Sequence, residues 1–163
     1  MTIHIRDAIR DDAAAIARIY NQGIDERIAT LETATRTALE RAQWLALRTT
    51  RHPVLVAEDG TELVGWSSLN QFNSRAAYDH VADISVYVDR GRRGQGVGKA
   101  LLEELANRAR ALGYHKLVLS AFPYNLLGRK LYERCGFREV GIYREQGMLD
   151  GKWVDVLLME RLL

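Results

Sequence analysis

The chain has 163 residues, 47% hydrophobic and 27% charged, which is typical of one globular domain spanning residues 1–163. The 23 basic and 21 acidic residues nearly balance, so charge gives no reason to expect nucleic acid as the main partner. The single cysteine, Cys135, excludes an internal disulfide, and the four scattered histidines give no reason to expect a metal site.

The N-terminal half is predicted to alternate strands and helices. Alternating apolar and polar residues predict a strand over 3–9, and an apolar face preceded by acids predicts a helix over 10–23. An aperiodic loop follows, and Thr37 with Glu40 then forms a capping box for a second helix. Two strands, 53–58 and 63–72, are joined by an Asp-Gly turn. The N-terminus lacks a signal-peptide pattern and no apolar run reaches the roughly 20 residues of a membrane span, so we expect a cytoplasmic protein with no membrane partner.

The C-terminal half continues with a strand over 81–88. Its alternation places Ala82, Ile84, Val86 and Val88 on one side and Asp83, Ser85 and Tyr87 on the other. The clearest helix runs from residue 96 to a stop at Gly113, and the apolar run 116–122 predicts a strand covered on both faces. A shorter helix ending at Gly136 and two last strands complete an α/β (α+β) arrangement with helices on both faces of a mixed sheet.

Residues 91–102 combine four glycines with basic side chains directly before a helix. A P-loop does not fit, because Gly94 and Gly98 are one residue too close and Ala100 replaces the magnesium-binding hydroxyl. A dinucleotide fingerprint fits poorly, because its third glycine comes one residue early. Two interpretations stay open: a turn that only starts the helix, or a loop whose backbone N–H groups and helix N-terminus hold a pyrophosphate.

Two motifs support the second interpretation. Arg93-x-x-Gly96-x-Gly98 after a strand resembles the acetyl-coenzyme A signature of the GNAT superfamily of N-acetyltransferases. The segment that carries Asn125, Leu131, Tyr132, Gly136 and Phe137 resembles the coenzyme A segment of that superfamily, with Gly128 a mild departure. Residues 75–88 and 147–160 resemble the phosphinothricin, methionine sulfoximine and arsinothricin acetyltransferase branch.

The resemblance implies a GNAT fold, with a mixed, mostly antiparallel sheet of about seven strands, and acetyl-CoA as co-substrate. In such a protein the strand backbone pairs with the pantetheine arm, and the glycine loop holds the pyrophosphate. The implied cofactor-binding residues are Val86, Tyr87, Val88, Arg93, Gly94, Gln95, Gly96, Val97, Gly98, Lys99, Asn125 and Arg129.

Asp83 stands where the superfamily places a glutamate base. Because aspartate is one methylene shorter, we expect it to act through a bridging water or on a slightly displaced strand. A free aspartate is a poor base at neutral pH unless burial raises its pKa. Two alternatives stay open: Asp83 as a solvated carboxylate or partner of Arg75, and His80 as the base.

Tyr132 is the implied acid, whose phenol would protonate the leaving thiolate, although a helical tyrosine can also serve packing alone. Cys135 could carry an acetyl group in a ping-pong reaction. No histidine in the sequence has an identifiable orienting partner for it, so direct transfer in a ternary complex is preferred.

The resemblance also assigns substrate contacts. Arg75 would grip the acidic head of a small amino acid with its guanidinium fork, near Tyr78, and Thr30 and Leu31 would wall the amino-acid pocket. The implied function is detoxification by acetylation of the α-amino group, in a homodimer. The alternatives are acetylation of another primary amine, such as a protein N-terminus or a polyamine, and an acyl-CoA-binding domain without turnover.

Overall fold

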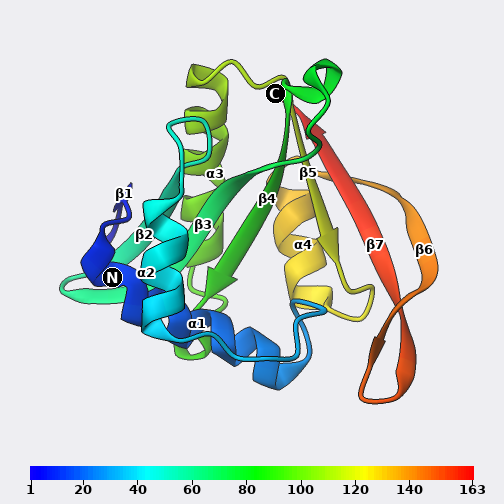
Figure 1. Ribbon diagram of the computed structural model, residues 1–163, viewed down its shortest axis with the longest axis horizontal. Coiled ribbons are helices and arrows are strands. Elements are labelled where there is room, and N and C mark those ends of the chain that lie inside the picture. The colour runs from blue at the N-terminus through cyan, green and yellow to red at the C-terminus, as the bar shows by residue number, and fades with distance from the viewer.

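One seven-stranded sheet runs through the computed structural model, which describes residues 1–163 (Figure 1). The predicted order of strands and helices is confirmed. The elements are β1 (Ile3–Asp7), α1 (Ala13–Glu26), α2 (Ala38–Ala46), β2 (Val54–Asp59), β3 (Glu62–Gln71), β4 (Val81–Val88), α3 (Val97–Ala111), β5 (Lys116–Ala121), α4 (Leu126–Arg134), β6 (Arg138–Leu149) and β7 (Lys152–Leu162). No helix combines the length and apolar character needed to cross a membrane.

The strand order is β1-β2-β3-β4-β5-β7-β6, and β4 with β5 is the one parallel pair in this otherwise antiparallel sheet. This arrangement confirms the predicted mixed, mostly antiparallel sheet. The parallel pairing is short, because it joins only Val81–Asp83 to Lys116–Val118. Beyond Asp83 the two strands diverge and leave a gap in the middle of the sheet (Figure 1).

Helices cover both faces of the sheet, as predicted: α1 and α2 lie on one face, and α3 and α4 on the other (Figure 1). Each face has its own apolar core. Leu55 of β2 packs in the core under α3, and its neighbour Val56 packs in the core under α1, because successive strand residues point to opposite faces. Leu101 and Leu105 of α3 are fully buried in the core on that face.

The prediction that β5 is covered on both faces is wrong. Leu117 and Leu119 are buried under α3 and α4, whereas Ser120 on the opposite face is exposed. The reason is that the core under α1 and α2 is built on residues of β2, β3 and β4 and contains no residue of β5, so the face of β5 that carries Ser120 has no helix packed on it. Ser120 and Ala121 line a cavity there instead.

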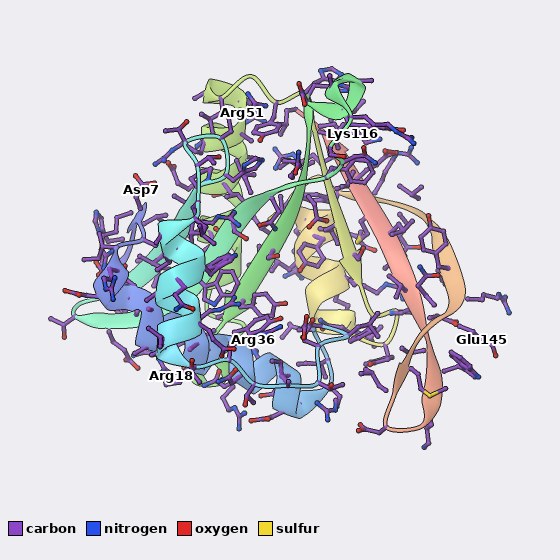
Figure 2. All side chains as sticks on the ribbon, viewed as in Figure 1. Asp7, Arg18, Arg36, Arg51, Lys116 and Glu145 are labelled. Carbon is purple, nitrogen blue, oxygen red and sulfur yellow. The ribbon has the colours of Figure 1, made fainter.

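Charged side chains are distributed around the rim of the molecule, and three of those labelled in Figure 2 lie in ion pairs that connect distant segments. Asp7 of β1 pairs with Arg108 of α3 at 2.7 Å. Arg18 of α1 pairs with Asp89, the residue that follows β4, and Lys116 pairs with Glu160 of β7 at 2.6 Å. Asp89 also accepts the backbone N–H of Gly91 at 2.9 Å and the side-chain amide of Gln22 at 3.1 Å. These contacts fix the start of the glycine loop against α1.

Candidate active site

Two cavities meet at the gap between β4 and β5. The smaller, of about 270 Å³, lies between the segment after α1 and the face of β4 that carries Asp83, Ser85 and Tyr87. The larger, of about 530 Å³, lies between the end of β4, the glycine loop and α4. Both cavities are lined by Ile28, Ala29, Val86, Tyr87, Asn125 and Tyr132. A molecule in one cavity can therefore contact a molecule in the other through the gap.

The glycine loop forms one end of the larger cavity. Gly94 and Gly96 have φ angles of 75° and 90°, in the left-handed region that favours glycine. Gly96 is also the N-cap of α3 and provides no capping side chain, so the first N–H groups of the helix are left for an external acceptor. Gly98 has a different role, because a Cβ there would lie 2.7 Å from Leu131 and would push α3 away from α4.

Four cationic side chains line the larger cavity, and no carboxylate does. Arg93 comes from the loop, Lys99 from the first turn of α3, and Lys130 and Arg134 from α4. Arg93 also bonds to Glu26 and donates to the carbonyl of Val88 at 3.3 Å. The sequence analysis missed the two α4 cations. Their spacing of four residues, which places both on one helix face, was the available signal.

The backbone of β4 presents free groups to the gap. The N–H of Asp89 donates to β3, whereas the carbonyl of His80 accepts from the start of β5. Because successive residues of a strand point their backbone groups to opposite edges, Val86 and Val88 face the gap and not β3. The parallel pairing has already ended at this point, so these N–H groups lack a strand partner.

Asp83 lies in the wall of the smaller cavity, opposite Asn70 of β3. Burial raises the pKa of its carboxyl from 3.8 to about 6, and the neighbouring amide of Asn70 offsets part of that effect. Asp83 is therefore ionised above about pH 6 and can accept a proton there. No lysine, arginine or histidine lines this cavity, so no cation in its wall neutralises the carboxylate.

Tyr132 of α4 lines both cavities, next to the gap. Burial raises the pKa of its phenol to about 12, so the group keeps its proton at neutral pH and can donate it. Asn125 caps the same helix by accepting the N–H of Gly128 at 3.0 Å. Its amide nitrogen donates to the carbonyl of Ile28 at 3.2 Å, which joins the wall of the smaller cavity to α4.

Tyr87 contributes to the walls of both cavities. Its ring stacks on Trp66 with the centroids 4.8 Å apart, and it meets the ring of Tyr20 edge-on at 5.1 Å. Burial raises the pKa of the Tyr87 phenol well above its usual range, so this group stays neutral. Thr30 and Leu31, as predicted for the substrate pocket, lie in the wall of the smaller cavity.

Five of the predicted site residues line neither cavity, namely Arg75, Tyr78, Gln95, Val97 and Arg129. Val97 is buried in the core at the start of α3, and the side chain of Gln95 donates to a loop carbonyl at 3.1 Å. Arg129 pairs with Glu139 of β6. These three residues support the loop and α4 from outside the cavities.

Arg75 and Tyr78 lie in the exposed turn before β4, where Tyr78 packs edge-on against Phe72 with the ring centroids 5.5 Å apart. His80, the alternative base, is also exposed and lies outside both cavities. Cys135 is buried, and burial raises the pKa of its thiol, so the reactive thiolate is disfavoured.

The sequence that forms these two cavities and the glycine loop also matches a known protein family. Residues 14–137 match the Acetyltransferase (GNAT) family, and the chain belongs to this family of acetyltransferases. The predicted membership of the GNAT superfamily, with its fold and its enzymatic class, is therefore confirmed.

Similar proteins extend over almost the whole chain. YwnH of Bacillus subtilis, whose name assigns it provisionally to the phosphinothricin acetyltransferases, is 36% identical over 158 residues, 96% of this chain and 97% of YwnH. The L-methionine sulfoximine/L-methionine sulfone acetyltransferase of Pseudomonas paraeruginosa is 32% identical and covers 98% of this chain, which spans 94% of that protein. The crystal structure of a phosphinothricin acetyltransferase from Sinorhizobium meliloti in complex with AcCoA has 30% identity and a TM-score of 0.92, and covers 100% of this chain and 89% of its own.

Proposed function

We propose that this chain is an acetyl-CoA-dependent N-acetyltransferase for the α-amino group of small amino acids of the phosphinothricin, methionine sulfoximine or arsinothricin type. The observation that carries the proposal is the meeting of a cationic cavity and a carboxylate-bearing cavity at the gap between β4 and β5. The names of the similar acetyltransferases support the substrate class. Acetylation of such amino acids would serve detoxification and antibiotic resistance.

The residues of the larger cavity fit coenzyme A. The first N–H groups of α3, together with Arg93 and Lys99, suit a pyrophosphate, and Lys130 and Arg134 add positive charge on the α4 side. The N–H groups of β4 that face the gap are placed to hold the pantetheine amides. One of them can also donate to the thioester carbonyl and stabilise the negative charge that develops on its oxygen.

The residues of the smaller cavity fit the acceptor amine. Asp83 accepts a proton from the amine, directly or through a water, so that the nitrogen can attack the acetyl carbonyl carbon. As the carbon–sulfur bond breaks, the electron pair stays on sulfur and Tyr132 donates a proton to it. Cys135 lies outside both cavities, which supports direct transfer in a ternary complex without an acetyl-enzyme.

We propose that the acidic head of the substrate binds Arg75, as the family resemblance implies; Arg75 lies in the exposed turn directly before β4, the strand that carries Asp83. Replacing Arg75 with alanine is expected to raise KM for the amino acid about tenfold or more and to leave KM for acetyl-CoA unchanged. The matched control is Arg110→Ala, an exposed arginine on α3. Equal increases in both KM values for Arg75→Ala would remove Arg75 from the substrate site.

We propose a homodimer in which a second copy covers the β6–β7 hairpin. The edge strand β6 and its partner β7 expose six large apolar side chains, each at least 49% exposed: Val140, Ile142, Tyr143, Met148, Trp153 and Leu162. Sedimentation is expected to show twice the chain mass of 18.5 kDa, and Tyr143→Asp is expected to shift the protein to monomer. Leu39→Asp, at an exposed leucine of α2, is the control and should stay dimeric. A wild-type monomer at micromolar concentration would overturn this proposal.

An amine panel tests the proposed activity. Purified protein is mixed with acetyl-CoA and, in turn, phosphinothricin, methionine sulfoximine, arsinothricin, ordinary amino acids, a peptide with a free N-terminus and a polyamine, and thiol release is followed. We expect the first three to react with the highest kcat/KM. A preference for the peptide or the polyamine would favour another primary amine as substrate. Tight acetyl-CoA binding without thiol release from any amine would indicate a non-catalytic acyl-CoA-binding domain.

A further inference from the structure

A chain of hydrogen bonds connects Arg48, in the loop after α2, to Ser85 of β4, which lines the smaller cavity together with Asp83. Its central member is Asn70 of β3, which is the direct cross-strand neighbour of Asp83 in the β3–β4 register. The side-chain oxygen of Asn70 accepts from Arg48 at 3.0 Å and from the hydroxyl of Ser68 at 3.1 Å. Its side-chain nitrogen donates to the hydroxyl of Ser85 at 3.2 Å.

These contacts fix which way the Asn70 amide points. An asparagine amide carries an acceptor on one side and donors on the other, and its orientation follows from its hydrogen-bond partners. A flipped amide would place its NH₂ group against the guanidinium of Arg48, which can only donate. The Asn70 nitrogen is therefore turned toward β4, where it donates to Ser85 and lies beside Asp83, the cross-strand neighbour of Asn70.

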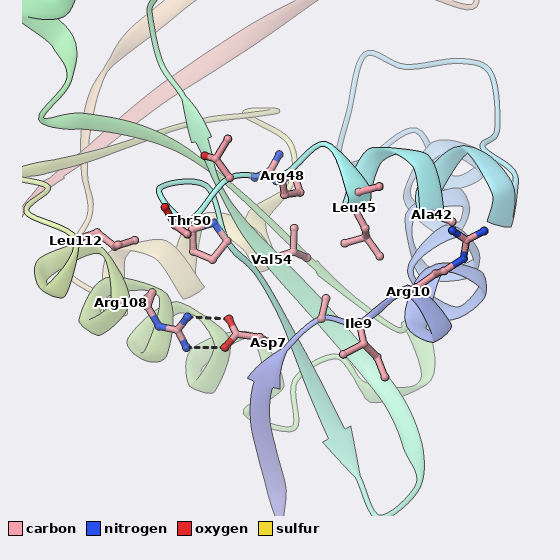
Figure 3. Close-up of a pocket in the computed structure, with 14 residues that line it drawn as sticks. Asp7, Ile9, Arg10, Ala42, Leu45, Arg48, Thr50, Val54, Arg108 and Leu112 are labelled. Atoms are coloured by element: carbon pink, nitrogen blue, oxygen red, sulfur yellow. Dashed lines mark hydrogen bonds and ion pairs between the residues drawn. The ribbon is translucent and has the colours of Figure 1, made fainter.

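Arg48 is itself held firmly. It donates to the carbonyl of His52 at 2.8 Å and to the carbonyl of Leu69, and its guanidinium lies over the ring of Trp44, 4.8 Å from the centroid. Arg48 also lines a groove of about 580 Å³ between α2, the end of β1 and α3 (Figure 3). That groove shares no lining residue with either cavity of the candidate site.

We propose that Asn70 and Arg48 are positioning residues for Asp83: Asn70 orients the carboxylate and stabilises its ionised form, and Arg48 holds the Asn70 amide in the donating orientation. The inference rests on the proposed role of Asp83 as the base. Asn70 matters because no cation lines the cavity, and the two titratable neighbours there, Tyr87 and Tyr132, both stay neutral. The other side chains that line the cavity near the carboxylate are uncharged: Thr30 from the segment after α1, Ser85 from β4, Ser120 from β5 and Val156 from β7.

The test measures the protonation of Asp83 in the full chain, by carbon NMR of its carboxyl group, without any substrate. Asn70→Ala and Arg48→Gln are each expected to raise the midpoint of that titration by about one pH unit, because the first removes the donor and the second removes the contact that holds the donor in its orientation. Asn70→Asp should raise it further, since a second carboxylate disfavours ionisation. The acid limb of kcat/KM should move with the NMR midpoint in each variant.

Arg51→Ala is the matched control. Arg51 also donates to two backbone carbonyls, of Leu112 at 3.2 Å and of Asp79 at 2.7 Å, and lies over an aromatic ring, but it makes no contact with Asn70. We expect the Asp83 titration midpoint of Arg51→Ala to equal that of the wild type. A melting curve of each variant tests whether it is folded. An unchanged midpoint in folded Asn70→Ala would overturn the proposal. If the midpoint shifts in Asn70→Ala but not in Arg48→Gln, the role proposed for Arg48 would be overturned. The NMR result does not depend on turnover, so it stays valid if the amine panel fails.

Discussion

Replacing Asp83 with asparagine is expected to lower kcat/KM for the amine by about 10²-fold or more at mildly alkaline pH, because an amide cannot accept the proton of the amine. In the wild type, kcat/KM should fall as the pH drops through about 6, the pKa to which burial raises the Asp83 carboxyl. The variant should lose that acid limb. Steady-state kinetics across the pH range measure both effects, with Asp79→Asn, an exposed aspartate before β4, as the control.

Loss of stability would not explain such a result. The folded-state pKa of Asp83 is raised from 3.8 to about 6, so the native state binds a proton more tightly than the unfolded chain. The free energy of unfolding therefore decreases as the pH rises between these values, by about 3 kcal/mol in total. Asp83→Asn removes the destabilisation that comes from burying an ionised carboxylate, so the variant should melt no lower than the wild type at mildly alkaline pH. An unchanged pH–rate profile in the variant would assign the base to another group.

Replacing Tyr132 with phenylalanine is expected to lower kcat by about 10²-fold and to leave the Kd for acetyl-CoA unchanged. The reason is that the buried phenol, with a pKa of about 12, is the protonated group next to the gap that can donate to the leaving thiolate. The defect should shrink with a thioester whose leaving thiol has a lower pKa, because such a thiolate needs no proton.

The control for Tyr132 is Cys135→Ser, three residues further along the chain. Its buried thiol has a raised pKa and lies outside both cavities, so near wild-type kcat is expected. Mass spectrometry of wild-type protein incubated with acetyl-CoA alone should find no acetyl group on Cys135. Full activity of Tyr132→Phe, or an acetylated Cys135 that passes its group to the amine, would contradict the direct-transfer mechanism.

Much of the fold could be predicted from local pattern. The spacing of the glycines predicted the loop before α3. Alternation predicted that Asp83, Ser85 and Tyr87 share one face of their strand, and these three residues line the smaller cavity. Alternation is a local property, so the sequence suffices for it.

Features that depend on non-local pairing could not be predicted. The apolar run of β5 could not reveal that α1 and α2 pack over β2, β3 and β4 and not over β5, and so it could not reveal that Ser120 would be exposed. Asn70 was missed for the same reason, because its position opposite Asp83 depends on the register between β3 and β4. Arg48 was missed because it contacts Leu69 and Asn70 of β3, which are distant from it in the sequence, and local patterns do not predict such contacts.

The most direct test of the central claim is a crystal structure of the protein with coenzyme A and an acceptor amino acid bound together. We expect the pyrophosphate against Arg93, Gly94 and Gly96 of the glycine loop, and the pantetheine arm along the free edge of β4. The amine nitrogen should lie within about 3 Å of the Asp83 carboxylate, or be joined to it by one water. Coenzyme A in the groove of Figure 3, or an amine remote from Asp83, would contradict the account.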